Sequence, residues 1–254
     1  MTAPLAARPS PLAAVSAVYA GQLSRARAAR GPLLIVATLQ SVGILVLLRG
    51  VVDENNPATA RQVVAGATVL VVAFVALNLL AQRFGLLRGS RALDYYAALP
   101  VSAAAVVLGT AASYATFTLP GAVLTAVLGC LLYGLPVSHL WVLVVVLPLA
   151  GAALAGAGAV LGLLPRRPEL ATTAGQLGMS AVLFLGIIPA HRMPGWLQPL
   201  RAAVPSTYAA DGLALSLAPH PRTGRIVVDL AVCAVTAVVA LALATWAFRR
   251  AVRS

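Results

Sequence analysis

The residues that could perform catalysis are few, and their spacing does not suit it. Ser180 would need a histidine base within hydrogen-bond reach to act as a nucleophile. The three histidines, at 139, 191 and 220, all lie outside the apolar runs. The chain has no lysine, which excludes a P-loop and a Schiff-base site. The scattered His and Cys residues lack metal-ligand spacing. We therefore expect no enzyme activity, no metal and no cofactor in this chain.

Polar residues inside apolar runs are the next candidates, because such residues often mark ion or substrate pathways. Asp229 is the only acidic residue in these runs. Arg225, four positions earlier, can pair with it on one helical face. Gln40, Asn78 and Gln176 are uncharged, and two roles are open to them: interhelical hydrogen bonding or lining a substrate path.

Composition shows what must position these residues. The chain has 254 residues, of which 61% are hydrophobic and only 9% charged. A soluble domain carries roughly 25% charged residues, so this composition predicts a membrane protein. The net charge of +12 then indicates cytoplasmic loops and contact with anionic lipid, and no nucleic-acid partner.

The apolar runs predict an all-α polytopic membrane protein of six transmembrane helices, forming a single domain over residues 1–254. About 20 apolar residues cross a bilayer. The expected spans are residues 32–48, 63–81, 103–132, 140–164, 170–188 and 226–248. With a cytoplasmic N-terminus, twelve arginines fall on the inner side and six on the outer. The positive-inside rule thus predicts that both termini are cytoplasmic.

The N-terminal segment, residues 1–31, is expected to hold a short tail and an amphipathic helix over about 11–30. Leu12, Val15, Tyr19 and Leu23 share one stripe at helical spacing. Arginines follow close to the first span, which favours a helix lying at the membrane interface. A solvated tail is the alternative.

The polar stretch over residues 82–102 is expected to contain a short cytoplasmic helix. Leu93, Tyr96 and Pro100 fall on one stripe, and Leu99 precedes a proline, so the helix should end there. Ser102 could then cap the third span. A short helix with exposed Leu and Tyr is a docking element, because such a face needs a partner. The alternative is a helix lying on the lipid headgroups.

Residues 189–224 are expected to form an outer helical hairpin before the last span. Six prolines divide the segment into two apolar pieces, about 195–203 and 206–217. Neither piece can cross a bilayer, and both suit an interfacial or re-entrant arrangement. Trp196 and Tyr208 are the kind of aromatic residue that anchors at headgroup depth.

Two of these segments resemble the type-2 permeases of ABC transporters (ABC-2). Residues 89–102, GSRALDYYAALPVS, are similar to the family's coupling-helix pattern G-T-L-E-x-L-L-x-x-P-V-S, with one extra residue near the glycine. Residues 194–197, PGWL, and 205–214, PSTYAADGLA, are similar to the pattern P-x-W-L followed by N-P-L-T-Y-x-x-D-A-L-R. Val204 and Ala214 stand where the family has Asn and Arg. The resemblance spans essentially the whole chain.

The resemblance implies the membrane half of an ATP-driven exporter in a bacterial cytoplasmic membrane. It implies an elbow helix, six spans, a coupling helix after span 2 and a second permease subunit, either identical or a paralogue. A separate ABC ATPase would hold ATP and Mg²⁺. Substrates would be small molecules, lipids or glycans. A non-transporting scaffold or regulatory subunit is the alternative.

The resemblance also assigns residues to two sites. Leu93, Tyr95, Tyr96 and Leu99 would bury against the ATPase, with Arg91 and Asp94 at the rim and Pro100 ending the helix. The outer hairpin would carry Trp196, Pro205, Tyr208 and Asp211.

Overall fold

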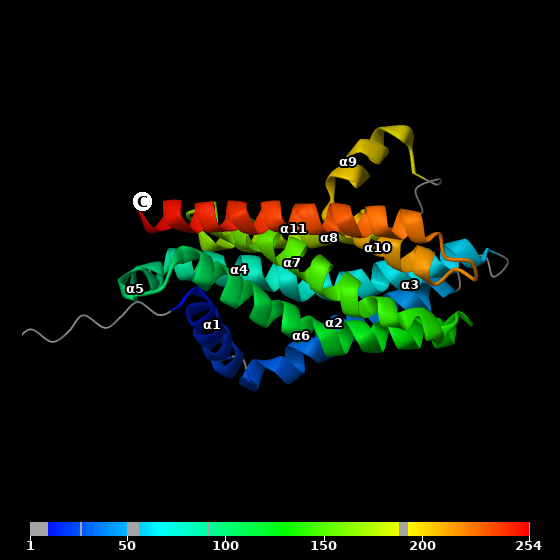
Figure 1. Cartoon of the computed structure of the whole chain (residues 1–254), viewed down its shortest axis with the longest axis horizontal. Helices are drawn as coiled ribbons and strands as arrows, with labels where there is room; N and C mark the ends of the chain where they lie inside the picture. Colours follow the sequence, from blue (N-terminus) through cyan, green and yellow to red (C-terminus); the bar gives the residue numbers. More distant parts are fainter. Residues whose placement is uncertain (1–9, 26, 50–55, 91, 188–192, 254) are drawn as a thin grey trace, which may run out of the picture.

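The computed structural model describes residues 10–25, 27–49, 56–90, 92–187 and 193–253, and over these residues the regular structure is helical (Figure 1). The long helices lie side by side and form an elongated bundle. The elements are α1 (Pro11–Arg25), α2 (Arg27–Arg49), α3 (Pro57–Val72), η1 (Ala73–Leu79), α4 (Leu80–Gly89), α5 (Ala92–Ala98), α6 (Ala103–Leu132), η2 (Val137–Val142), α7 (Leu143–Leu163), α8 (Pro168–Ile187), η4 (Gly195–Leu197), α9 (Gln198–Ala203), α10 (Pro205–Ser216) and α11 (Thr223–Val252).

The central element is one continuous helix made of α3, η1 and α4. Pro57 occupies its first turn, and the Asn56 side chain accepts a hydrogen bond from the backbone N–H of Thr59 at 3.3 Å. The middle part, η1, has π-helical hydrogen bonding. In the most apolar stretch of this helix 89% of the residues are buried, whereas the corresponding share in α11 is 22%. The continuous helix is therefore the core, and α11 lies at the perimeter.

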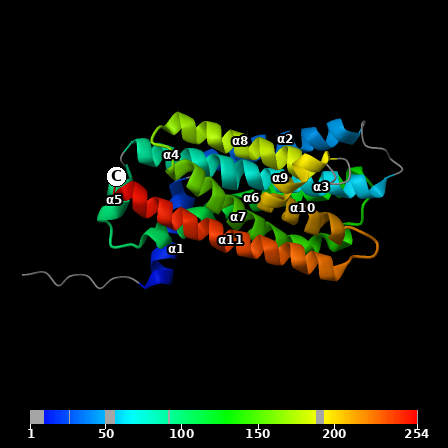
Figure 2. The same cartoon turned by 90° about the horizontal axis from the view of Figure 1, so that it is seen from above.

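Glycines let α7 approach its neighbours closely. A Cβ on Gly158 would lie 2.4 Å from the Leu77 carbonyl oxygen, and one on Gly162 would lie 2.4 Å from that of Ala81. On another face, a Cβ on Gly156 would meet Ala240 of α11 at 2.7 Å. Small residues at such contacts are how helices pack tightly in lipid. Seen from above, α8 and α2 lie along one side of the bundle and α11 along the other (Figure 2).

Four helices are long and apolar enough to cross a membrane in the described part of the chain: residues 57–89, 103–132, 137–163 and 223–252. The chain is thus a multi-pass membrane protein. Two further helices, α2 and α8, occupy the places expected for the first and fifth spans, and the six-span count stays a prediction. Polar residues in the first half of α8, Glu169, Thr172, Thr173 and Gln176, lower its apolar character.

Several boundaries differ from the expected ones. The second span was expected over residues 63–81 with a polar stretch from residue 82, but the helix continues to Gly89 because Phe84 and Leu87 are buried. At the other end it starts at Pro57. Similarly, α2 begins at Arg27, inside the segment expected to be tail and amphipathic helix. These helices extend beyond the apolar runs because helical packing continues where the sequence becomes polar.

The two ends of the bundle differ in their short elements (Figure 1). One end holds α5, the α7–α8 loop and the C-terminal end of α11, and we call it the α5 end. The opposite end holds the start of α3 together with α9 and α10, and we call it the hairpin end. Helix α10 packs between α3, α7, α8 and α11, whereas α9 protrudes from the bundle.

Candidate functional site

Helix α5 is held against the bundle by one of its faces. Leu93 is 2% exposed and Tyr96 is 8% exposed. The Tyr96 hydroxyl accepts a hydrogen bond of 3.1 Å from Nε2 of Gln22 on α1. The buried face thus fixes α5 to the chain's own helices.

This burial corrects one expectation, that Leu93 and Tyr96 face a partner. The residues on the other side of α5 are the accessible ones: Tyr95 is 60% exposed, and Asp94, Leu99 and Pro100 are also exposed. Arg91 lies outside the described residues. The stripe of Leu93 and Tyr96 does exist, but it faces inward because α1 and the bundle supply the cover.

The ends of α5 are fixed by backbone and side-chain bonds. The helix stops at Ala98, as the proline at position 100 predicts, and the N–H of Leu99 bonds to the Tyr96 carbonyl at 3.3 Å. Ser102 caps α6 as predicted: its hydroxyl accepts from the N–H of Ala105 at 3.1 Å. Before α5, the guanidinium of Arg88 donates to the carbonyls of Leu163 and Leu164 at the end of α7.

Helix α1 packs across α6 next to α5. A Cβ on Gly109 of α6 would lie 2.8 Å from the Val15 carbonyl oxygen and 2.8 Å from Cβ of Val18. The Tyr19 hydroxyl bonds to that of Thr116 at 3.3 Å. The expected stripe is therefore only partly in contact, since Leu12 is 83% exposed. The face of α1 that contacts the bundle is rotated toward Ala14, Val18 and Gln22. The missing side chain of Gly109 allows α1 to approach α6 closely on this face.

The polar residues inside the helices do not form one cluster. Asn78 is 3% exposed in η1, where its Oδ1 accepts from Nε2 of Gln82 at 3.1 Å. A Cβ on Gly175 of α8 would lie 3.0 Å from the same oxygen, so Asn78 belongs to the contact with α8. Gln176, the next residue of α8, is exposed, and Gln40 on α2 is half-buried.

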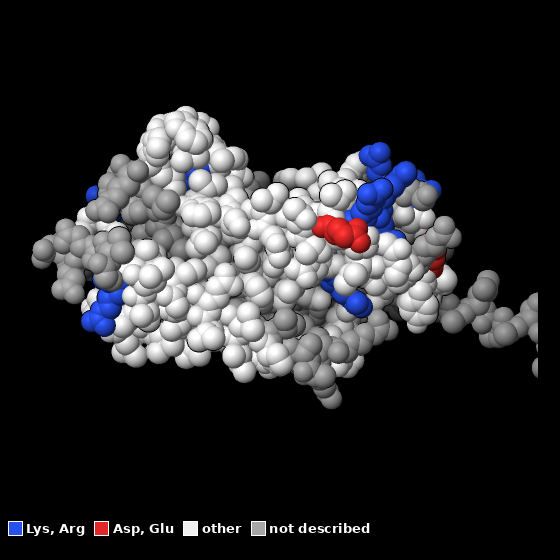
Figure 3. Space-filling view, turned by 180° about the vertical axis from the view of Figure 1, so that it is seen from behind, with Lys and Arg blue, Asp and Glu red and all other residues white. Residues whose placement is uncertain are grey.

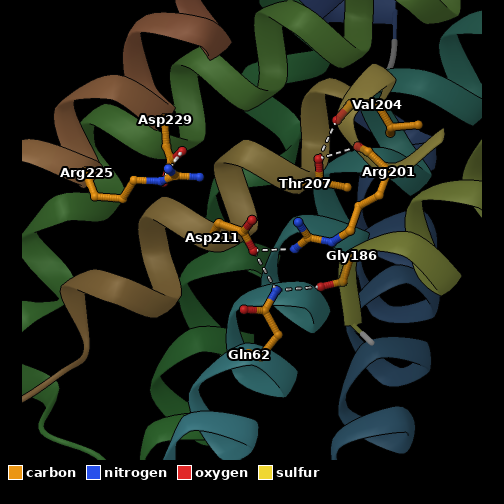
Figure 4. Close-up of polar contacts among 8 residues, drawn as sticks. All are labelled: Gln62, Gly186, Arg201, Val204, Thr207, Asp211, Arg225 and Asp229. Carbon is orange, nitrogen blue, oxygen red and sulfur yellow. Dashed lines mark hydrogen bonds and ion pairs between the residues drawn. The ribbon is translucent and has the colours of Figure 1, made fainter. Parts of the chain in front are cut away.

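A network of polar side chains ties the hairpin to the bundle (Figure 4). Asp211 on α10 forms an ion pair with Arg201 on α9, with 2.5 Å between Nη2 and Oδ1. The Gln62 amide on α3 donates to Asp211 Oδ1 at 3.0 Å and to the Gly186 carbonyl of α8 at 2.9 Å. Three helices and α9 thus meet at one carboxylate and one amide.

The turn between α9 and α10 is closed by two hydroxyl groups. Thr207 donates to the carbonyl of Arg201 at 2.8 Å, and Tyr208 donates to that of Ala202 at 3.0 Å.

Pro205 starts α10, and its carbonyl accepts from the Cys233 thiol at 3.4 Å. Trp196 is 76% exposed at the start of α9. Of the four hairpin residues expected to matter, three fix the hairpin and Trp196 projects from it.

The predicted pair of Arg225 and Asp229 is confirmed. Nε of Arg225 lies 3.5 Å from Oδ1 of Asp229, whose side chain is only 1% exposed (Figure 4). A pocket beside this pair is also lined by Arg61, Gln62 and Asp211. Sequence reasoning missed Gln62 and Arg201. Their shared partner Asp211 lies 149 positions after Gln62 and 10 positions after Arg201, and both separations are too long for helical spacing to indicate the contact.

An apolar helical bundle with a short helix fixed at one end and a packed helical hairpin at the other defines a polytopic helical membrane protein. The sequence model of the family described as "ABC-2 family transporter protein" matches residues 15–246. The chain therefore belongs to this family and is an ABC-2 type permease, a subunit that is not itself catalytic. Such permeases generally work with an ABC ATPase. A search of the curated proteins finds no match.

Proposed function

We propose that this permease exports a small molecule, lipid or glycan across a bacterial cytoplasmic membrane, driven by a separate ATPase subunit that docks on α5. In this proposal the α5 end and both termini are cytoplasmic, and the hairpin end faces outward. ATP and Mg²⁺ would bind to the ATPase subunit.

The two faces of α5 carry the proposal. A helix of seven residues is too short to be stable alone, and here Leu93 and Tyr96 hold it in place. Rigid attachment by one face lets a push on the other face reach the bundle. Tyr95 and Leu99 are then the apolar anchors available to a partner, with Asp94 beside them.

The surface of α8 supports pairing with a second permease subunit. Gln176 and Thr173 are exposed between Leu170 and Leu177, which are 57% and 66% exposed. A glutamine amide facing lipid would lack hydrogen-bond partners, which costs free energy. A second subunit, or a substrate path between two subunits, would supply those partners. In the proposal Gln176 and Gln40 line that path, and Asn78 supports it from within the packed core.

The test is co-purification of the ATPase subunit with permease variants, together with transport in the reconstituted complex. Tyr95→Ala and Leu99→Ala should each weaken docking by about 2 kcal/mol, the size of an interface hot spot, and reduce transport. Leu200→Ala is a matched control, because Leu200 is an exposed leucine at the opposite end. If both Tyr95→Ala and Leu99→Ala retain wild-type docking, α5 is not the coupling element. If the unmodified protein also shows no transport, the scaffold alternative is favoured.

A further inference from the structure

A second feature of the α5 end is a pocket between α4, α5 and the last turn of α11. Its lining includes Arg88, Leu93, Asp94, Arg166, Ala251 and Val252. We propose that this pocket binds the headgroup of an anionic phospholipid, with the phosphodiester held between Arg88 and Arg166.

The charge around the pocket favours an anion. The elements around the pocket are the end of α4, α5, the α7–α8 loop with the start of α8, and the end of α11. Their described residues include two carboxylates, those of Asp94 and Glu169, and a larger set of arginines. These are Arg83, Arg88, Arg166, Arg167, Arg249, Arg250 and Arg253. The charged side chains visible in Figure 3 lie toward the two ends of the bundle, with an uncharged band between them. A basic pocket at the end of a membrane helix bundle is the usual site for an anionic headgroup.

The arginine geometry prepares the pocket for a phosphate. Arg88 is held in place by its bonds to the carbonyls of Leu163 and Leu164. Arg166 lines the same pocket, so two positive charges share it and repel each other. A phosphodiester between Arg88 and Arg166 would relieve this repulsion and accept charge-assisted hydrogen bonds.

The end of α11 beside the pocket carries the residue types that are typical of the lipid headgroup region. Trp246 on α11 is 52% exposed, and the guanidinium of Arg250 lies 5.5 Å from the centre of its ring. Exposed tryptophan near a membrane surface marks the interface. Ala251 and Val252, which line the pocket, follow Arg250 directly in the sequence. Leu243, one turn before Trp246, is also exposed on this apolar helix. A lipid lying along α11 can therefore place its headgroup in the pocket.

Asp94 selects the kind of headgroup. Its carboxylate repels any anion, and because an ionised carboxylate only accepts hydrogen bonds, donors on the headgroup offset that repulsion. A glycerol headgroup carries hydroxyl donors beyond its phosphodiester, so phosphatidylglycerol satisfies both the arginines and Asp94. Phosphatidylcholine has no donor and no net negative charge.

The experiment is native mass spectrometry of the full chain in detergent, titrated with phosphatidylglycerol or phosphatidylcholine. Phosphatidylglycerol should bind with the higher occupancy. Arg166→Gln should weaken that binding about fivefold, the effect of one basic side chain at an anionic surface. Arg167→Gln is the matched control, because it removes the same charge from the next residue, which does not line the pocket.

Equal binding of the two lipids, or equal losses in Arg166→Gln and Arg167→Gln, would overturn the proposal. Inorganic phosphate is added in a separate arm. If phosphate at the lipid concentration displaces phosphatidylglycerol, the pocket is a site for small anions and the lipid assignment is wrong. No ATPase is present in this assay, so its outcome does not depend on the docking proposed for α5.

Discussion

The two ends of the bundle use charge in opposite ways. At the hairpin end, Asp211 and Asp229 are each paired with an arginine, and Gln62 joins the first pair to α3 and α8. At the α5 end, arginines surround a pocket, and the exposed face of α5 carries Tyr95 and Leu99. The first arrangement closes contacts within the chain, and the second leaves a surface for molecules outside it.

Substitutions at the two ends should therefore act on different properties, some on folding and others on binding. Side chains whose partners lie in this chain should change the free energy of unfolding when removed. Side chains exposed at the α5 end should leave folding unchanged and act on docking or lipid binding. The two tyrosines of α5, Tyr95 and Tyr96, separate these effects because they are adjacent in sequence. Their rings pack edge to face, with 5.8 Å between the ring centroids.

Tyr96→Ala should have the largest effect on stability. It removes a buried aromatic ring and the partner of Gln22, and large-to-small changes of this kind cost about 3 kcal/mol. Tyr95→Ala, the matched control, should stay within about 0.5 kcal/mol of the wild type. Unfolding of the purified chain in detergent micelles measures both. Equal losses would mean that α5 has no inner and outer face.

Asp211→Ala should come next, at the hairpin end. It leaves Arg201, whose side chain is 13% exposed, without its carboxylate, and it removes one of the two acceptors of Gln62. Loss of hydrogen bonds to a charged group costs about 2 kcal/mol. Asp94→Ala is the control, since Asp94 is exposed at the α5 end. A melting temperature that falls as much for Asp94→Ala as for Asp211→Ala would remove the contrast between the ends.

Local sequence patterns predicted the parts of this structure that depend on near neighbours. The stop of α5 before Pro100 and the pairing of Arg225 with Asp229 follow from residues within four positions of each other. The two short pieces of the hairpin likewise follow from the spacing of the prolines. Each of these features is decided by backbone geometry or helical spacing, which a sequence displays directly.

Contacts between distant segments were not predictable in the same way. Gln62 meets Asp211, 149 positions later, and no pattern around Gln62 indicates that partner. The stripe of Leu93 and Tyr96 was visible, but its direction depends on Gln22 of α1, 74 positions before Tyr96. Periodicity shows that a helix has an apolar face, and only the packing of other helices shows whether the chain itself covers that face.

Ser102→Ala should have the smallest effect, and it tests how α5 is joined to the bundle. The Ser102 hydroxyl accepts from the N–H of Ala105 and fixes the first turn of α6. Losing an N-cap of this type costs about 1 kcal/mol. Unfolding in micelles should show that loss, and Ser102→Asp should restore most of it because aspartate also caps. If Ser102→Ala also weakens ATPase docking while Ser102→Asp does not, the cap sets the position of Leu99 and Tyr95 as well as the start of α6. If neither variant changes unfolding, the contacts of Leu93 and Tyr96 alone hold α5 in place.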